Sequence, residues 1–368
     1  MSFITNIRSV AKYESKILVR SWFFRLFTLL AAFILGVLSF SLLLAEDSGG
    51  FWFGKAVPSN IPYLILLLLN TGQAVVAVFL SSEFLKRDKK LDTSEVFYVR
   101  PLSNAEYVVG KIWGNLRVFL LLNLLILAIV LVFNFMASGV AVDLPAYLVY
   151  FFLISIPTLI FIIGLSIFLM LVLKNQALTF ILLLGYIGLT LFYIQDKFYY
   201  LFDYMVYNLP LFKSTIVGFS NLELILNHRA IYFFAGLGFI FFTIFLFRRL
   251  PNARRSHYPW LFLSLCMFLL AGTAGFRHVR SILREGEVRA LYTSINNKYV
   301  HEPKMAIDRY DISVEQKPET IRSVVGMEGT ALAASEVFTF CLNPGLRVEE
   351  VKEGEKPLDF GLRRKIFP

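Results

Sequence analysis

Charged side chains are scarce in this chain. Only 17% of its 368 residues are Asp, Glu, Lys or Arg, whereas 57% are hydrophobic. A soluble domain has about a quarter of its residues charged. This composition excludes a water-soluble fold for most of the chain, and it excludes disorder and a disulfide-rich secreted scaffold as well. We expect an all-α polytopic membrane domain followed by a small β-rich segment outside the membrane.

Cysteine and histidine are few. The two cysteines lie in unlike surroundings, Cys266 in an apolar run and Cys341 in a polar one, so we expect no disulfide between them. The four histidines are scattered along the chain, and their spacing predicts no metal site.

The motifs of the common hydrolases are missing. A phosphate-binding loop would need an upstream glycine before Gly110-Lys111, but position 105 is Ala and Ile112 follows. His301-Glu302 lacks the second histidine of a zinc peptidase. We therefore predict no enzyme, no catalytic residue and no cofactor or metal in this chain.

Long apolar runs are abundant. A spanning helix needs about 20 apolar residues, because the bilayer core offers the backbone no water. Seven runs qualify, at 22–44, 61–80, 113–136, 147–173, 178–194, 231–247 and 260–276. Lys and Arg concentrate in the N-terminus and in every second connection, so the positive-inside rule places the N-terminus in the cytoplasm. With seven spans, everything after Phe276 lies on the far side.

Two segments beside the spans have alternative interpretations. Residues 3–20 alternate apolar and basic residues, which predicts an amphipathic helix at the inner interface; the alternative is the solvated start of the first span. Residues 195–227 are rich in aromatics, which predicts short interfacial or re-entrant helices over the outer mouth, or a plain aromatic belt.

The spans contain few polar groups at mid-depth. Arg25 and Arg117 lie near the cytoplasmic ends and can snorkel, which argues against a proton-coupled transporter. The candidates for a translocation path are Asn70, Thr71, Gln73 and Asn123; the alternative is that such groups, with Asn134, Ser155 and Thr158, make hydrogen bonds between helices. Gly164 with Ser166, and Gly185 with Gly188, are candidates for close helix packing.

The C-terminal part changes character. Residues 277–298 are charged and favour a helical stalk. Alternating runs then predict strands at 310–314, 321–327, 337–342 and 346–351, with a turn at Asn343-Pro344-Gly345. Four strands are few for an independent domain. We expect this segment either to pack on a partner or to be the incomplete start of a longer β domain.

Residues 81–111 join the second and third spans on the cytoplasmic side. They combine mixed charges with an apolar patch at 96–99, and Ser103 or Asn104 can cap a helix that runs through Glu106. This pattern suits docking into a groove of a soluble partner. The alternative is an ordinary solvated loop.

This segment resembles the equivalent connection of type 2 ABC exporter permeases (ABC-2), which reads Glu, Arg, Gly-Thr-Glu, Pro-Val-Ser, Gly-Lys. Asp92 stands for the first glycine and Leu102 for the valine, and Ser94 is inserted. The resemblance covers about residues 1–250 and is nearest to the permeases named for multicopper-enzyme maturation. It implies an ATPase-coupling loop at Glu83, Arg87, Asp92, Thr93, Glu95, Arg100, Pro101, Ser103, Gly110 and Lys111.

The resemblance also implies the partners and the location. The expected partners are a separate P-loop ATPase carrying ATP and Mg, a second permease copy or sister permease, and the lipid bilayer. No nucleic acid is expected, and the expected location is a bacterial inner membrane. The tail resembles the start of the periplasmic region in bacterial permease/zinc-aminopeptidase fusions. The domains expected are a six-span permease (1–250), an extra seventh span (251–276), a stalk (277–309) and a periplasmic β-rich segment (310–368).

Two other functions stay open. The chain can be a non-transporting assembly subunit of an envelope complex, or the membrane anchor of a zinc-peptidase fusion without its peptidase part.

Overall fold

The computed structural model describes residues 3–44, 57–82, 102–137, 140–194, 196–214, 218–219, 221–247, 258–316, 320–342 and 346–361. The chain divides into two compact units, Met1–Ile282 and Leu283–Pro368. Each unit is described by itself.

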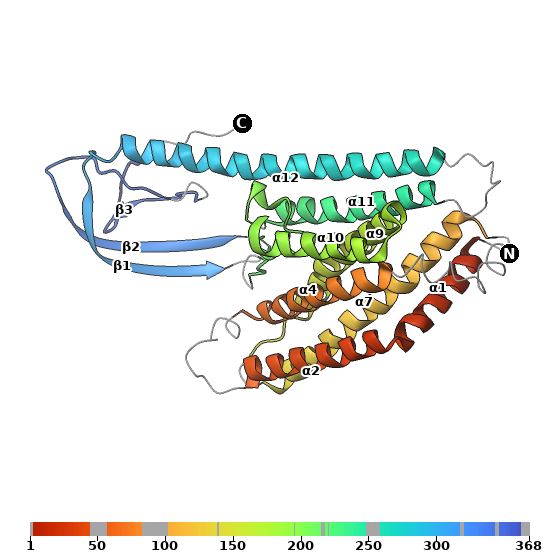
Figure 1. The fold of residues 1–368 in the computed structure, drawn as a ribbon. Helices are drawn as coiled ribbons and strands as arrows, with labels where there is room; N and C mark the ends of the chain where they lie inside the picture. The colour runs from red at the N-terminus through yellow and green to blue at the C-terminus, as the bar shows by residue number, and fades with distance from the viewer. Residues whose placement is uncertain are drawn as a thin grey trace. The chain divides into compact units, whose positions relative to one another are not determined.

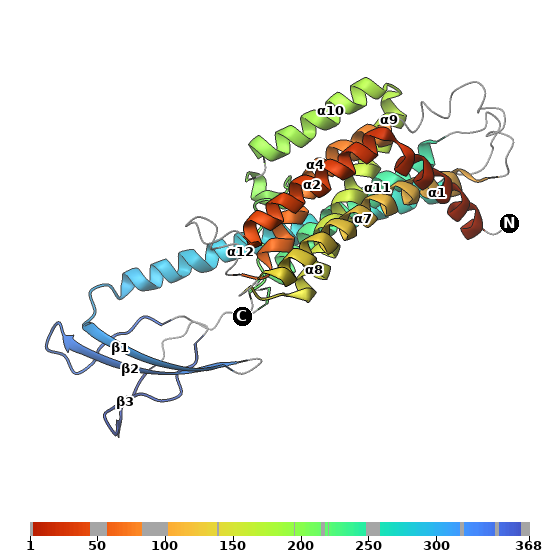
Figure 2. The ribbon, with the colours of Figure 1, turned by 90° about the horizontal axis from the view of Figure 1, so that it is seen from below.

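Seven helices of the described residues are long and apolar enough to cross a membrane, which confirms the predicted number. The third and sixth helices begin nine residues earlier than predicted, and the seventh ends at Lys298 and not at Phe276. The helices are α2 (Trp22–Leu44), α4 (Asn60–Ser82), α7 (Asn104–Met136), α8 (Leu144–Tyr150) continued by η1 (Phe151–Ser155) and α9 (Ile156–Leu173), α10 (Gln176–Leu189) continued by η2 (Thr190–Ile194), α11 (Leu222–Leu246) and α12 (Tyr258–Lys298). Figures 1 and 2 show how they are arranged.

The N-terminal helix α1 (Phe3–Arg20) is separate from α2, because the chain leaves the helical conformation at Ser21. Ala11, Ser15 and Leu18 are buried on one face of α1. This face packs on the first part of α7, and both ribbon views place the two helices side by side (Figures 1 and 2). The predicted amphipathic helix is confirmed, and its buried face contacts protein.

Helix α9 lies in the core of the first unit and packs on α11, α4 and α7. The α9–α11 crossing depends on two glycines: a Cβ at Gly164 would lie 2.7 Å from the carbonyl oxygen of Gly236, and one at Gly236 would lie 2.7 Å from the backbone of Ile160. The close packing predicted at Gly164 is thus confirmed. On α10 a Cβ at Gly185 or Gly188 would meet nothing within 4 Å, so these glycines pack on no other helix in the described part of the chain.

The segment between α10 and α11 matches its two expectations only in part: Phe198, Tyr199 and Phe202 are exposed, as in an aromatic belt, but other residues are buried. Its described residues contain one short helical turn, η3 (Phe198–Tyr200), and the chain then enters the protein. Tyr204, Met205 and Val206 are 0%, 1% and 0% exposed. A plain aromatic belt would leave Tyr204 at the surface, whereas its ring packs against Phe161 on α9 and Tyr186 on α10.

The second unit starts within α12 at Leu283 and contains an antiparallel hairpin of β1 (Met305–Gln316) and β2 (Ile321–Ala331). The predicted strands at 310–314 and 321–327 are confirmed and extend further. The strands predicted at 337–342 and 346–351 are wrong, since neither pairs with another strand within the described residues. Two short strands, β3 (Lys352–Glu353) and β4 (Lys356–Pro357), pair with each other instead. The turn predicted at 343–345 lies outside the described residues.

The stalk predicted at 277–298 is helical. It is the continuation of α12, which runs without a break from Tyr258 to Lys298.

Candidate functional site

The predicted coupling residues fall in two groups. Ser103, Gly110 and Lys111 lie at the start of α7. The others lie outside the described residues: Glu83, Arg87, Asp92, Thr93, Glu95, Arg100 and Pro101.

The start of α7 is fixed by a capping box. The Glu106 N–H donates to the Ser103 hydroxyl (3.2 Å), and the Ser103 N–H donates to the Glu106 carboxylate (2.6 Å), which confirms the predicted cap. The Asn6 amide on α1 donates to the same carboxylate (2.8 Å), and the Asn104 amide donates to the carbonyl of Phe247 just after α11 (2.7 Å). The end of the coupling segment is therefore tied to two other helices.

Small residues let α1 lie directly against α7. A Cβ at Gly110 would lie 2.7 Å from Val10, and one at Gly114 would lie 2.8 Å from the Ala11 carbonyl oxygen. Beside them Lys111 pairs with Glu14 at 3.2 Å, with side chains 1% and 5% exposed. The coupling residues Gly110 and Lys111 thus contact α1 in the described structure.

Arg117 joins the same contact. Its guanidinium donates to the Ser15 hydroxyl (2.6 Å) and to the Ala11 carbonyl (3.1 Å). The sequence indicated that this side chain can snorkel to the interface. In the structure α1 covers that part of α7 and supplies the acceptors.

Three of the four candidate path residues lie in one polar cluster at mid-depth. Asn70 and Gln73 on α4, Asn123 on α7 and Ser155 in η1 are all 0% exposed. The Asn123 amide donates to Gln73 (2.9 Å), the Gln73 amide to Asn70 (2.7 Å), and the Ser155 hydroxyl to Asn123 (2.8 Å). In the described state these groups satisfy one another, so the cluster joins three spans by hydrogen bonds.

Thr71, the fourth candidate, faces a different partner. Its hydroxyl lies 2.6 Å from the Tyr207 hydroxyl, which belongs to the segment between α10 and α11. The segment between α10 and α11 therefore contacts one of the candidate path residues, Thr71 on α4.

A buried arginine holds the same segment. Arg229 on α11 is 3% exposed and donates to the Leu153 carbonyl (2.7 Å), the Tyr204 carbonyl (2.9 Å) and the Thr158 hydroxyl (2.9 Å). The sequence alone does not single out this residue, because the predicted sixth span starts at position 231, beyond Arg229. The signal available was the pair His228-Arg229 between the apolar residues 224–226 and that predicted span.

Asp203 organises the turn that follows. Its carboxylate accepts hydrogen bonds from the N–H groups of Tyr207 (2.9 Å) and Asn208 (2.8 Å). Burial raises the pKa of Asp203, while these hydrogen bonds and the nearby Arg229 charge lower it by less.

The structure brings together two histidines that were expected to be scattered. His228 on α11 and His278 on α12 are both 0% exposed, and their ring centroids lie 5.1 Å apart. Among the described residues no group of three His, Cys, Asp or Glu side chains could hold a metal ion.

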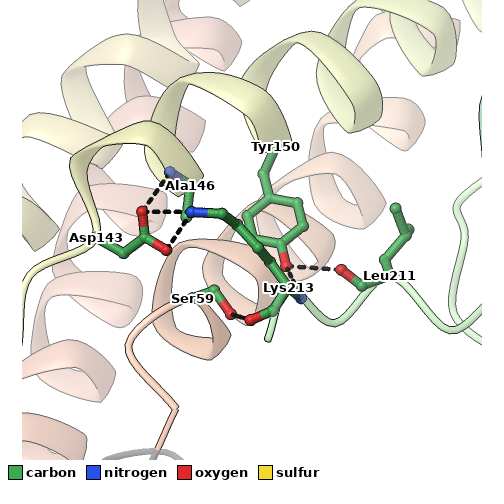
Figure 3. A network of polar contacts seen from close by, with 6 residues as sticks. All are labelled: Ser59, Asp143, Ala146, Tyr150, Leu211 and Lys213. Atoms are coloured by element: carbon green, nitrogen blue, oxygen red, sulfur yellow. Dashed lines mark hydrogen bonds and ion pairs between the residues drawn. The ribbon is translucent and has the colours of Figure 1, made fainter. Parts of the chain in front are cut away.

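An ion pair ties the far end of the segment (Figure 3). The Lys213 ammonium donates to the Asp143 carboxylate (2.8 Å), which also caps α8 at Ala146 (3.1 Å). The Tyr150 hydroxyl donates to the Leu211 carbonyl (2.7 Å), and the Ser59 hydroxyl donates to the Lys213 carbonyl (2.8 Å). The starts of α4 and α8 thereby hold the segment in place.

The chain matches no protein-family model and no curated protein. The candidate site is therefore defined by geometry alone. It has two parts: the α1–α7 contact, and the segment between α10 and α11, which polar side chains hold in place.

Proposed function

We propose that this chain is the membrane-spanning permease subunit of an ATP-driven ABC exporter of type 2. The observation that supports this most is the α1–α7 contact. The loop that resembles a coupling segment ends at a capped helix start, and Lys111, Gly110 and Gly114 bind that start to α1.

A rigid start of α7 suits the transmission of movement. A partner that pushes on the loop before Ser103 would move α1 and α7 together, because the buried ion pair and the close backbone contact resist sliding. Since α7 continues to Met136, the movement would reach the polar cluster at Asn123. In this account ATP is bound and hydrolysed by a separate subunit, and Asn70, Thr71, Gln73 and Asn123 lie where a path could open.

The experiment is a test of association. Arg87→Glu with Arg100→Glu should weaken binding of the P-loop ATPase subunit in a pull-down from membranes, because the loop would lose two of its cations. The matched control is Arg284→Glu with Arg289→Glu, which reverses two charges on the C-terminal part of α12. Equal ATPase recovery for both double variants, with normal membrane insertion, would contradict docking through this loop.

One observation favours a second function, that of a non-transporting assembly subunit. The β1–β2 hairpin has one apolar face, with Tyr310 opposite Met327 and Ile312 opposite Val325, and all four side chains are exposed. In this account the C-terminal unit binds an envelope protein. Transport by vesicles that contain the chain and its ATPase would exclude a role restricted to assembly.

A further inference from the structure

A strained turn begins the segment between α10 and α11. Phe198, Tyr199 and Tyr200 have φ angles of 52°, 58° and 62°. This left-handed conformation is unfavourable for residues with a Cβ, and three in succession are rare. Such a turn persists only where its surroundings hold it.

Two imidazoles hold this turn. His278 Nε2 lies 2.8 Å from the carbonyl oxygen of Tyr199, and His228 Nε2 lies 3.0 Å from that of Tyr200. A carbonyl oxygen can only accept, so each Nε2 carries the hydrogen. The two rings come from different helices, α11 and α12, and they fix two consecutive carbonyl groups.

The other nitrogen of each ring does not contact the turn. With the hydrogen on Nε2, Nδ1 keeps a lone pair, and both Nδ1 atoms are buried with no hydrogen-bond partner among the described residues. Both rings are therefore neutral in this state. Uptake of a proton at Nδ1 would bury a positive charge beside the second ring, whose centroid is 5.1 Å away.

The charges around the pair strengthen this effect. Arg229 follows His228 on α11 and is itself buried, and its charge opposes a further cation. Asp203 is the acidic group of the turn, but its carboxylate is occupied by two backbone N–H groups. The remaining hydroxyls, of Tyr204 and Tyr232, are uncharged at neutral pH. The other charged residues near the turn are exposed: Asp196 and Lys197 just before it, Glu223 on α11, and Arg277 and Arg280 on α12.

We propose that His228 and His278 form a proton-sensitive clamp on residues 198–206. While both rings are neutral, the clamp holds the segment closed. When a ring takes up a proton from the solvent, the charge is accommodated only if the segment opens and admits water, and opening also relaxes the left-handed turn. The proposal concerns this segment alone and does not depend on the exporter proposal.

Opening would uncover a defined surface. Tyr204 now packs against the rings of Phe161, Tyr186 and Tyr232, on α9, α10 and α11. Withdrawal of Tyr204, Met205 and Val206 would expose these aromatic rings at the end of the bundle. The clamp thus regulates access to the interior of the first unit.

The test measures access to Met205 as a function of pH. Met205→Cys is made in a Cys266→Ser, Cys341→Ser background, in lipid nanodiscs, and labelled with a maleimide. Asp196→Cys in the same background is the reference, because Asp196 is exposed. The labelling of Met205→Cys is divided by the labelling of Asp196→Cys, so that the pH dependence of the thiol reaction itself cancels. We expect this ratio to rise severalfold from about pH 7.5 to about pH 5, the range in which histidine titrates. A ratio that stays constant would overturn the proposal.

Glutamine variants identify the titrating groups, because a glutamine amide can donate to a carbonyl without taking up a proton. In the double variant His228→Gln with His278→Gln, the labelling ratio should no longer change with pH, whether its value is high or low. The exposed His301→Gln and the turn variant Asp203→Asn should keep the rise. A rise that persists in the double variant, or that is lost in Asp203→Asn, would contradict a histidine clamp. If the double variant does not fold, His278→Gln alone should reduce the rise.

Discussion

At the scale of single residues, three buried charged side chains of this membrane domain have polar partners. Lys111 and Glu14 are nearly inaccessible and form an ion pair, and Arg229 donates to three carbonyls and a hydroxyl. Unpaired, such groups would be costly in a medium without water. These partners explain how ionisable side chains occur between apolar spans.

The Lys111–Glu14 pair allows a double-mutant cycle. Lys111→Met leaves a buried carboxylate without this cation and should lower the free energy of unfolding by about 3 kcal/mol or more. Lys111→Met with Glu14→Met should recover most of that loss, because no charge is left buried. Thermal unfolding of the detergent-solubilised protein measures both, and additive losses in the double variant would show that the two charges do not interact.

The mid-depth cluster makes a similar prediction. Asn123→Leu keeps the volume but leaves Gln73 without its donor and Ser155 without its acceptor. We expect a loss of about 0.5–2 kcal/mol, the range measured for interhelical hydrogen bonds in membranes. The comparison is Leu124→Ala, the next position on α7, which is 42% exposed. If Asn123→Leu unfolds at the wild-type temperature, the cluster does not hold the spans together.

At the scale of elements, the helices approach one another where side chains are absent. Gly164 and Gly236 bring α9 and α11 into backbone contact, and Gly110 and Gly114 do so for α7 and α1. A side chain at any of these positions would meet backbone or a Cβ, which cannot move aside as the end of a flexible side chain can.

A substitution at the α9–α11 crossing tests this. Gly236→Val would place a Cβ 2.7 Å from the backbone of Ile160 and should destabilise the protein by at least about 1–3 kcal/mol. Gly185→Val on α10 meets open space and should fold normally. Fluorescence-detected size exclusion after heating compares the two, and equal survival would contradict a tight crossing.

The elements also show what a sequence can reveal. Seven runs of apolar residues were sufficient to predict the spans, since a bilayer demands continuous hydrophobicity and little else. The strand predicted at 337–342 failed because alternation predicts a strand only where a partner edge is present, and partners are not local.

The candidate site was less predictable than the spans. Ser103 and Glu106 could be recognised because a capping box is a local pattern. The contacts Lys111–Glu14, His228–His278 and Arg229–Tyr204 join residues far apart in the chain, and no spacing rule relates them. The polar residues at Asn70, Gln73 and Asn123 were found, but their mutual hydrogen bonds depend on how three helices pack.

At the scale of the whole molecule, an odd number of spans has a simple consequence. If all seven helices cross the bilayer, the N-terminus and the end of the seventh span lie on opposite sides. We propose that this end lies in the cytoplasm, because basic residues are frequent near it.

This topology can be measured directly. A single cysteine at Tyr13, which is exposed on α1, should be labelled by an impermeant maleimide only after the cells are opened. A single cysteine at Ser294, which is exposed on α12, should be labelled in spheroplasts with an intact inner membrane. Labelling of both from the same side would exclude seven spans.

The central claim, that the chain works with a separate ATPase, is tested most directly by its companions. The tagged protein is purified from native membranes in mild detergent, and the proteins that accompany it are identified and quantified by mass spectrometry. The account predicts a P-loop ATPase in stoichiometric amount, lost in Arg87→Glu with Arg100→Glu. Envelope or peptidase proteins in its place, with no ATPase, would contradict the permease proposal and make the C-terminal unit the functional part.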